Sequence, residues 1–382
     1  MTAAAAVSPA LTLFFTTGQS LTRWQELGML TRELALYRRL AEHVARVTLV
    51  TYGDARDRDY QGAWNGIDVV CNRWSLPGAG YRHWLTRWPQ SWQRRPGVFK
   101  SNQFDGSLLG LDLARRFGHP FVARGGYPFA AFIARRHGAD SPQARRARLM
   151  EFHMVSRAEQ VVVTTPEMAM ALRRDHGVAG ERIQVIPNHV DTDHWSPRGV
   201  GDRPHGTRLV HVGRLTPQKN LPTLLQALER LPGTPELWII GSGPDAQGLK
   251  QQAAPLGERV RFLGNCPHDM LPQVLGQCDI FVLPSHYEGH PKALLEAMSM
   301  GLAVVGSRAP GIDGVIRDGE NGRLFHGGAA GLAAVLASLL ASPQQRQSLG
   351  QAARAHVERH FSLQRVLNQE LALIHALHRR RG

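Results

Sequence analysis

Short apolar runs alternate with helical patterns along most of this chain. Residues 11–15 and 46–52 have the length and composition of buried strands, and between them, over residues 27–44, apolar residues recur every three to four positions. Regular alternation of this kind predicts βαβ units and therefore parallel sheets covered by helices. The further runs that we interpret as strands are residues 120–123, 160–164, 182–186, 207–212, 237–240, 260–263, 279–284 and 302–305.

A chain of 382 residues is too long for one ordinary hydrophobic core, so two domains are expected. A polar segment at residues 191–206 is rich in proline and glycine, which is typical of a linker. The strand–helix alternation starts again after it, and two amphipathic helices close the chain at residues 342–360 and 362–378.

The predicted fold class is therefore α/β, with two doubly wound, Rossmann-like domains that face a central cleft, followed by C-terminal helices. The expected boundaries are residues 1–198 for the first domain and 199–360 for the second. Residues 361–382 are expected to form a helix that packs back on the first domain.

The composition indicates a globular protein with anionic partners. Hydrophobic residues make up 43% of the chain and charged residues 20%, and the net charge is +14 with a pI near 10.7. Nucleic acids, phosphorylated small molecules and anionic membrane surfaces all fit such a charge. Only four of the 45 basic residues are lysines, so the charge comes mainly from arginine.

Several features favour a cytoplasmic location. No apolar run approaches the roughly 20 residues that a membrane-spanning helix needs. No basic residue precedes Arg23, so the charged head of a secretory signal is missing. Cys71, Cys266 and Cys278 show no metal-ligand spacing, which predicts buried thiols in a reducing compartment.

Two glutamates, Glu288 and Glu296, stand eight positions apart around the start of a predicted helix. Glu288 follows the strand at residues 279–284, so it should lie at the carboxyl edge of a parallel sheet, where open α/β sheets bind ligands. Glu296 lies inside an apolar helix, where a charge is costly unless it has a partner. The pair predicts a polar small-molecule site, although surface glutamates and an acid/base hydrolase fit the pair alone as well.

A second candidate loop follows the strand at residues 207–212. Gly213 allows the backbone to approach a ligand closely, and Arg214 and Lys219 stand between it and the next predicted helix. A guanidinium and an ammonium at a helix start suit a diphosphate. The competing interpretation is two solvated basic residues on a loop.

Residues 237–246 fit G-x-G-x-x-A, one form of the dinucleotide-binding fingerprint. That function requires an acidic residue at the end of the next strand, to bind a ribose. The next strand ends in Gly264 and Asn265 instead. A tight glycine turn before a helix is therefore the favoured interpretation.

Together these motifs resemble the glycosyltransferases of the GT-B fold, specifically the large retaining family 4. The resemblance covers about residues 160–325 and rests on the order and spacing of several motifs. They are Gly213-Arg214-Leu215 with Lys219, Gly241-Ser242-Gly243-Pro244, Phe262-Leu263-Gly264, the E-x7-E pair Glu288 and Glu296, residues 318–324, and residues 186–191.

The resemblance implies a retaining enzyme that moves a sugar from a nucleotide-diphosphate donor to a glycan or lipid-linked acceptor, in cell-surface polysaccharide or lipopolysaccharide biosynthesis. It implies catalytic roles for Arg214 and Lys219, which would hold the diphosphate, and for Glu288, which would hold hydroxyls of the transferred sugar. Glu296 would bind the donor ribose. The other donor-binding residues that it implies are Gly213, Gly264, Asn265, Gly289, His290, Pro291 and Lys292. The family needs no metal and no cofactor, because the nucleotide sugar is a substrate.

Two departures from the family pattern stand out. Gly314 replaces a glutamate that the family often has, which leaves the backbone N–H groups of residues 311–314 as candidate phosphate ligands. In the first domain, which would bind the acceptor, the usual Gly-Gly loop is Thr17-Gly18-Gln19 and the usual histidine is absent. We expect acceptor or phosphate contacts at Gly18, Gln19 and Arg124.

Residues 73–95 combine four of the eight tryptophans with five arginines. This mixture suits an anionic membrane interface or a lipid-phosphate acceptor, and also stacking on sugars or nucleic acid. The competing interpretation is an irregular, partly buried loop. Peripheral association with the inner face of the cytoplasmic membrane is therefore a further expectation.

Two alternative functions remain at this stage. A nucleic-acid-binding protein would explain the charge, but no recognition motif supports it, and we expect no nucleic-acid partner. Another GT-B enzyme acting on nucleotide sugars, such as an epimerase, would share the donor-site motifs.

Overall fold

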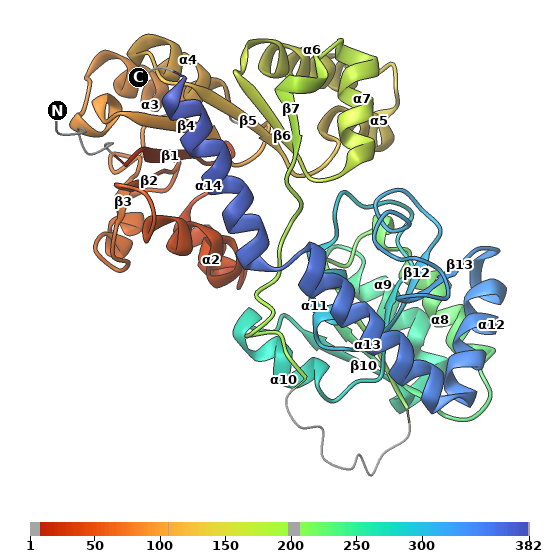
Figure 1. Cartoon of the computed structure of the whole chain (residues 1–382). Helices are drawn as coiled ribbons and strands as arrows, with labels where there is room; N and C mark the ends of the chain where they lie inside the picture. Colours follow the sequence, from red (N-terminus) through yellow and green to blue (C-terminus); the bar gives the residue numbers. More distant parts are fainter. Residues whose placement is uncertain (1–7, 106, 198–206, 381–382) are drawn as a thin grey trace. The chain divides into compact units, whose positions relative to one another are not determined.

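The structure is a computed structural model that describes residues 8–105, 107–197 and 207–380. Strands and helices alternate through both halves of the chain, as the sequence predicted. The chain divides into two compact units, one formed by Met1–Pro187 together with Val366–Gly382 and the other by Asn188–Arg365. Each unit contains one parallel sheet with helices packed around it (Figure 1), so the α/β class with two Rossmann-like domains is confirmed.

The sheet of the first unit has seven parallel strands in the order β3-β2-β1-β4-β5-β6-β7. Their bounds are β1 Ala10–Phe14, β2 Val47–Val50, β3 Ile67–Val70, β4 Gly97–Ser101, β5 Phe121–Gly125, β6 Gln160–Val163 and β7 Ile183–Val185. The central strands β1 and β4 are buried along their whole length, as expected for strands that lie between two layers of helices. Its helices are α1 Leu21–Glu26, α2 Leu30–Ala41, α3 Gly78–Arg87, α4 Ser107–Phe117, α5 Phe129–His137, α6 Pro142–Arg157, α7 Pro166–His176 and most of α14 Leu363–Arg379.

The sheet of the second unit has six parallel strands in the order β10-β9-β8-β11-β12-β13. Their bounds are β8 Arg208–Val212, β9 Glu236–Ile240, β10 Val260–Gly264, β11 Ile280–Leu283, β12 Ala303–Ser307 and β13 Arg323–Phe325. The helices around it are α8 Leu221–Glu229, α9 Ala246–Ala253, α10 Leu271–Leu275, α11 Lys292–Ser299, α12 Gly328–Ala341 and α13 Pro343–His360. Short 3₁₀ turns at Pro217–Lys219 and His268–Met270 precede α8 and α10.

The strand order of each sheet reverses between two central strands, β1 and β4 in the first unit and β8 and β11 in the second. At such a point the connections leave the carboxyl edge in opposite directions and open a crevice. The loops that follow β8 and β11 carry the Gly213 and Glu288 motifs, so the topology places both motifs at the switch point of the second sheet.

The unit boundaries differ from the expected ones by several residues. The second unit begins at Asn188 rather than at residue 199. Asn188 donates from its backbone N–H and its side-chain amide to His290, and Trp195 is buried in the core of the second unit. The segment taken for a linker is thus ordered and packed up to Pro197, while residues 198–206 lie outside the described residues.

The C-terminal helix α14 belongs to the first unit from Val366 onward. Glu370 on this helix is buried and forms an ion pair with Lys100, which is equally buried in β4. Burial lowers the pKa of Lys100 and raises that of the neighbouring Tyr37 on α2. This ion pair fixes the helix to the middle of the sheet.

None of the helices in the described ranges combines the length and the apolar character needed to cross a bilayer. Cys71 and Cys278 are buried, as the sequence predicted, whereas Cys266 is only partly buried.

Candidate functional site

The candidate site lies where the loops after β8 and β11 meet. Nζ of Lys219 donates to Oε1 of Glu288 at 2.6 Å, and both side chains are largely buried. The backbone N–H of His286 donates to the Gln218 carbonyl at 2.9 Å, and the Gln218 side chain donates to the Tyr287 carbonyl at 2.9 Å. Two loops from neighbouring strands therefore hold an acidic and a basic group in fixed contact.

The turn that begins α8 is shaped by Asn220. Its φ of 51° is in the left-handed region, and its side-chain amide donates to the Pro284 carbonyl at 3.1 Å. Asparagine tolerates this conformation better than most residues do. The contact joins the Lys219 turn to the end of β11, which adds a further connection between the two loops.

Glycines let two backbone segments of the same unit approach one another closely. A Cβ on Gly241 would lie 2.0 Å from the Gly213 carbonyl oxygen, and one on Gly243 would lie 2.1 Å from the Leu215 carbonyl oxygen. The G-x-G turn therefore packs directly against the loop that carries Arg214. This agrees with the interpretation of the motif as a tight glycine turn.

Gly311 supports the Glu288 loop. It has a φ of 81°, and a Cβ there would lie 2.4 Å from the Glu288 carbonyl oxygen. The backbone N–H of Glu288 donates in turn to the Pro310 carbonyl at 2.9 Å. The expectation that the backbone of residues 311–314 is open to phosphate is wrong for two of its groups, because the N–H groups of Ile312 and Asp313 both donate to the Ala309 carbonyl.

Glu296 has a protein partner that the sequence did not reveal. It is 3% exposed on α11, and its Oε1 lies 2.9 Å from Nε2 of His268. The indole of Trp195 packs on the same imidazole, with ring centroids 5.0 Å apart. The cost of burying Glu296 is thus offset within the protein, by a histidine that lies 28 positions upstream.

His211 is a second residue that sequence reasoning missed. It is fully buried in β8, its Nδ1 lies 2.9 Å from the Val282 carbonyl oxygen, and among the described residues Nε2 has no hydrogen-bond partner. Burial lowers its pKa to about 4, and the charge of Lys219 acts in the same direction. The sequence signal that could have identified it is a histidine inside an otherwise apolar strand.

The other predicted donor-site residues differ in their exposure and in the elements that carry them. Arg214 and Asn265 are exposed, Gly264 ends β10 with a φ of 66°, and Lys292 is the first residue of α11 and half-buried. These residues follow β8, β10 and β11, which places them on the carboxyl side of the same sheet.

His290 and its neighbours connect Glu288 to α11. Pro291 caps the helix, and Gly289 is half-buried. The His290 imidazole is buried, accepts from the Asn188 backbone N–H at 3.2 Å and packs against Phe361 at 5.0 Å. Its side chain thus interacts with the two ends of the second unit.

In the first unit, the predicted residues follow neighbouring strands. Gly18 adopts a φ of 76° in the exposed turn after β1, and the Gln19 carbonyl accepts from the Tyr52 N–H at 3.0 Å. Arg124 is half-buried at the end of β5 and donates from Nη1 to the Asn102 carbonyl at 3.1 Å. All three lie at the carboxyl edge of the first sheet.

The tryptophan-rich segment is helical rather than an irregular loop, since it contains α3 and a 3₁₀ turn at Ser91–Arg94. Trp92 is buried in the core, whereas Trp74 and Trp88 are 46% and 56% exposed. The guanidinium of Arg73 lies 4.0 Å from the ring centroid of Trp74. Only part of the segment is therefore available to a ligand.

Two family models of glycosyltransferases match this chain. The family model named glycosyl transferases group 1 matches residues 200–356, and the one named glycosyltransferase family 4 matches residues 28–194. A glycogen synthase of Mycobacterium tuberculosis is 29% identical over 286 residues, which cover 72% of this chain and 67% of the relative. The lipopolysaccharide core biosynthesis glycosyltransferase LpsE of Rhizobium meliloti is 32% identical over 220 residues, covering 56% of this chain and 63% of that protein.

Among solved structures, Anabaena Alr3699/HepE in complex with UDP and glucose superposes with a TM-score of 0.75 at 19% identity. The superposition covers 96% of this chain and 99% of the Anabaena chain. At this identity the likeness establishes the GT-B fold.

Proposed function

The chain belongs to the group 1 and family 4 glycosyltransferases, and from that premise we propose that it transfers a sugar from a nucleotide-diphosphate donor to a glycan or lipid-linked acceptor with retention of configuration. The observation that carries the proposal is the contact of Lys219 with Glu288 at the switch point of the second sheet. A cation and a carboxylate side by side suit the phosphates and the sugar hydroxyls of a sugar diphosphate.

In the proposed reaction the acceptor hydroxyl oxygen bonds to the anomeric carbon on the face from which the phosphate leaves, and the bond from that carbon to the phosphate oxygen breaks. The nucleoside diphosphate leaves with the electron pair of this bond. The hydroxyl proton passes to the departing phosphate oxygen. Lys219 and the exposed Arg214 would stabilise the developing negative charge. Positioning and leaving-group stabilisation then supply most of the rate acceleration.

Glu288 is assigned a binding role rather than that of a general base. Its carboxylate accepts from Lys219 and lies 3.5 Å from the Gln218 amide nitrogen, so these two neighbours hold it in position as an acceptor for sugar hydroxyls. Glu296 is proposed to bind the donor ribose, with His268 holding its carboxylate in place.

The donor site is proposed to work without a metal, because Arg214 and Lys219 can supply the positive charge. The Anabaena structure contains UDP, which makes UDP-sugars the first donors to test. The group 1 relative LpsE, named for lipopolysaccharide core biosynthesis, supports an acceptor of the cell envelope.

Ligand-induced thermal shifts test the donor assignment directly, because binding to the folded state raises its melting temperature. We expect one nucleotide-sugar family among UDP-, GDP- and ADP-glucose to shift the transition, in the presence of EDTA as well as without it. Lys219→Met should abolish the shift. If no nucleotide sugar shifts the transition, the proposed function is wrong.

Peripheral association with an anionic membrane is a separate proposal, supported by the net charge of +14 and by the exposed indoles of Trp74 and Trp88. The chain should sediment with phosphatidylglycerol vesicles and not with phosphatidylcholine vesicles. Replacing both tryptophans by serine should weaken this binding, and unchanged binding would contradict the role of the indoles.

A further inference from the structure

A pocket of about 550 Å³ lies between α5, α6 and α7 of the first unit, and its lining contains none of the residues assigned so far. Such a volume is within the usual range for small-molecule sites. Most of its wall is apolar, and four of the lining residues are alanines, whose short side chains leave the space open. The lining residues from these helices and the preceding loops include Phe104, Pro128, Ala130, Ala134, Met168 and Leu172.

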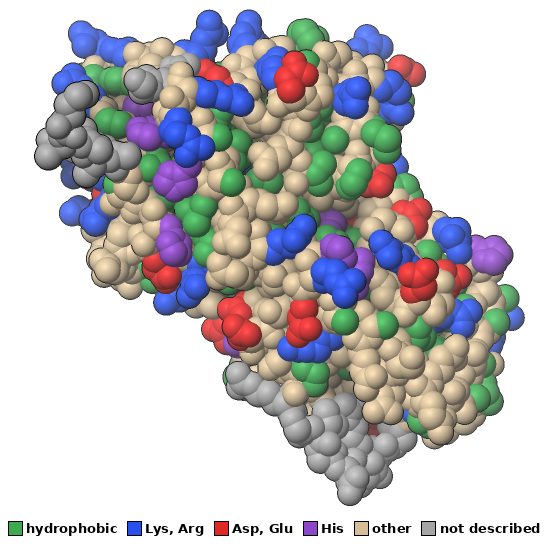
Figure 2. Space-filling model, in the orientation of Figure 1, with side chains coloured by type: hydrophobic (Ala, Val, Ile, Leu, Met, Phe, Trp, Pro, Cys, Tyr) green, Lys and Arg blue, Asp and Glu red, His purple; other side chains and the backbone are tan. Residues whose placement is uncertain are grey.

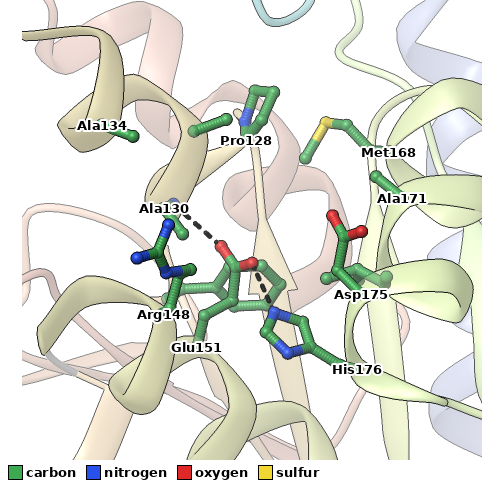
Figure 3. Close-up of a pocket in the computed structure, with 12 residues that line it drawn as sticks. Pro128, Ala130, Ala134, Arg148, Glu151, Met168, Ala171, Asp175 and His176 are labelled. Carbon is green, nitrogen blue, oxygen red and sulfur yellow. Dashed lines mark hydrogen bonds and ion pairs between the residues drawn. The ribbon is translucent and has the colours of Figure 1, made fainter. Parts of the chain in front are cut away.

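A buried polar clamp at the base of the pocket holds the three helices together. Glu151 of α6 is 7% exposed, and its Oε2 accepts from the backbone N–H of Ala130 in α5 at 3.0 Å. Its Oε1 lies 2.9 Å from Nε2 of His176 at the end of α7. Figure 3 shows the carboxylate between these two partners, with Ala134, Pro128 and Met168 beyond it. The clamp uses both carboxylate oxygens, so one side chain links α5, α6 and α7 beside the pocket.

The surroundings of the pocket favour an anionic ligand. Arg148 of α6 lines it, with one guanidinium nitrogen donating to the Ala139 carbonyl at 3.0 Å. The three helices carry eight arginines and only three carboxylates. Two of the carboxylates, Glu151 in the clamp and Asp175, line the pocket, and Asp175 accepts from Arg174 at 2.6 Å. The helices around the pocket therefore carry an excess of positive charge, and Arg148 is the arginine in the lining itself.

Three large apolar side chains on α6 and α7 are exposed. Leu149 and Phe152 on α6 are 69% and 49% exposed, and Met170 on α7 is 59% exposed. Phe152 packs against the pocket residue His176, with ring centroids 6.0 Å apart. In Figure 2 apolar side chains gather among basic ones over the upper right of the molecule, where these helices lie in Figure 1. Exposed apolar side chains beside a pocket mark an interaction site.

We propose that this pocket binds the apolar chain of an anionic amphiphile, with Arg148 contacting its anionic group. A chain of methylene groups would fill the alanine-lined space and remove apolar surface from water. The arginine excess would select a phosphate or carboxylate head over a neutral one. The inference deepens the proposed function and rests on it in one respect, since such an amphiphile would be the lipid end of a lipid-linked acceptor.

The test uses the full chain and decyl phosphate below its micelle concentration, with decyl maltoside as the probe with a neutral head. Calorimetry should show one saturable site for decyl phosphate. Arg148→Gln should lower its affinity about tenfold, the effect of one charge-assisted hydrogen bond, and leave decyl maltoside binding unchanged. Arg145→Gln, on the same helix and outside the pocket lining, is the matched control and should change neither.

Filling the space tests the pocket itself. Ala171→Phe on α7 and Ala134→Phe on α5 each place a large side chain in the pocket, from opposite walls. At least one of the two variants should fold, and each should abolish decyl phosphate binding. Equal binding by a folded variant, or no binding by the unaltered chain, overturns the proposal. Nucleotide-sugar thermal shifts measured on the same variants report on the second unit, so a failure of the proposed function is separated from a failure of the pocket.

Vesicles distinguish the source of the ligand. If Ala171→Phe reduces sedimentation with phosphatidylglycerol vesicles while the Trp74/Trp88 serine variant retains decyl phosphate binding, the pocket takes its chain from a bilayer lipid. If Ala171→Phe leaves sedimentation unchanged and abolishes decyl phosphate binding, the pocket takes monomeric amphiphiles. Both outcomes support the site, and they identify where its ligand comes from.

Discussion

Lys219 and Glu288 are 69 positions apart in the chain, and Nζ of the lysine lies 2.6 Å from Oε1 of the glutamate. The contact follows from the sheet topology, because β8 and β11 are neighbours at the point where the strand order reverses. The pair therefore belongs to the scaffold of the proposed donor site. A bound diphosphate would share Lys219 with Glu288, which couples recognition of the phosphate to that of the sugar.

The first prediction concerns this pair. Lys219→Met should lower the turnover of sugar transfer by about 10²–10³-fold, the usual effect of removing one group that stabilises developing charge. Glu288→Gln should also lower turnover, because it replaces the proposed hydroxyl acceptor and the ion-pair partner of Lys219. The measurement is release of the nucleoside diphosphate from whichever donor the thermal-shift screen identifies. Lys250→Met removes an exposed lysine of the same unit and should leave turnover unchanged. Turnover within a few fold of the unaltered enzyme in both site variants would contradict the assignment.

The second prediction concerns Gly311. Gly311→Ala should destabilise the fold by more than the roughly 1–3 kcal/mol that a strained φ costs, because the new Cβ would meet the Glu288 carbonyl oxygen at 2.4 Å. Relief of this clash displaces the Glu288 loop, so the affinity for the donor should fall too. Gly319→Ala is the matched control, since Gly319 has a φ of 80° with nothing within 4 Å of a Cβ. Urea unfolding measures the stability of the two variants, and calorimetry measures their affinity for the donor. If both quantities are equal in the two variants, the role of Gly311 is refuted.

Much of the fold could be predicted because its signals are local. Apolar runs gave the position of most strands, and the loops after β8 and β11 carry residues typical of a ligand site. β4 was missed because Lys100 interrupts its apolar pattern, and the partner that permits its burial, Glu370, lies 270 positions away. β3 was missed at the edge of the sheet, where Asp68 pairs with Arg46 and Arg95 at 2.7 Å each.

Prediction of the candidate site from the sequence has the same limit, because contacts between distant residues leave no local signal. Motif spacing singled out Lys219 and Glu288, and the structure brings the two side chains into contact. The sequence could not show that Glu296 pairs with His268, because this contact depends on how the turn before α10 packs against α11. The clamp formed by Glu151 and His176 is a further case, since the two residues come from separate helices whose sequences contain no ligand motif.

The third prediction concerns pH. His211 has a pKa of about 4 in the folded state because it is buried, against 6.5 for an exposed histidine. Between these values the unfolded chain binds a proton that the folded chain does not, so stability should fall as the pH drops from 6.5 to 4. The full loss is about 3 kcal/mol, at about 1.4 kcal/mol for each pKa unit. Burial also lowers the pKa of His356 to about 4, which adds a loss in the same direction.

Urea unfolding of the second unit at a series of pH values tests this. His211→Asn keeps a donor for the Val282 carbonyl. It should reduce the pH dependence of the free energy of unfolding by the amount that one bound proton contributes. His326→Asn replaces an exposed histidine of the same unit and should follow the unaltered chain. An unchanged slope in the His211 variant would show that this histidine does not cause the acid sensitivity.

The fourth prediction concerns the ion pair of Lys100 with Glu370, both 1% exposed. Lys100→Met or Glu370→Leu alone should destabilise the first unit by about 3–5 kcal/mol, because each leaves one buried charge without a partner. The double variant should recover most of this loss, since two apolar side chains then meet in the space of the pair. Chemical unfolding of the four proteins gives the coupling energy. Additive losses in the double variant would mean that the two side chains contribute independently, and that the pair does not fasten α14 to β4.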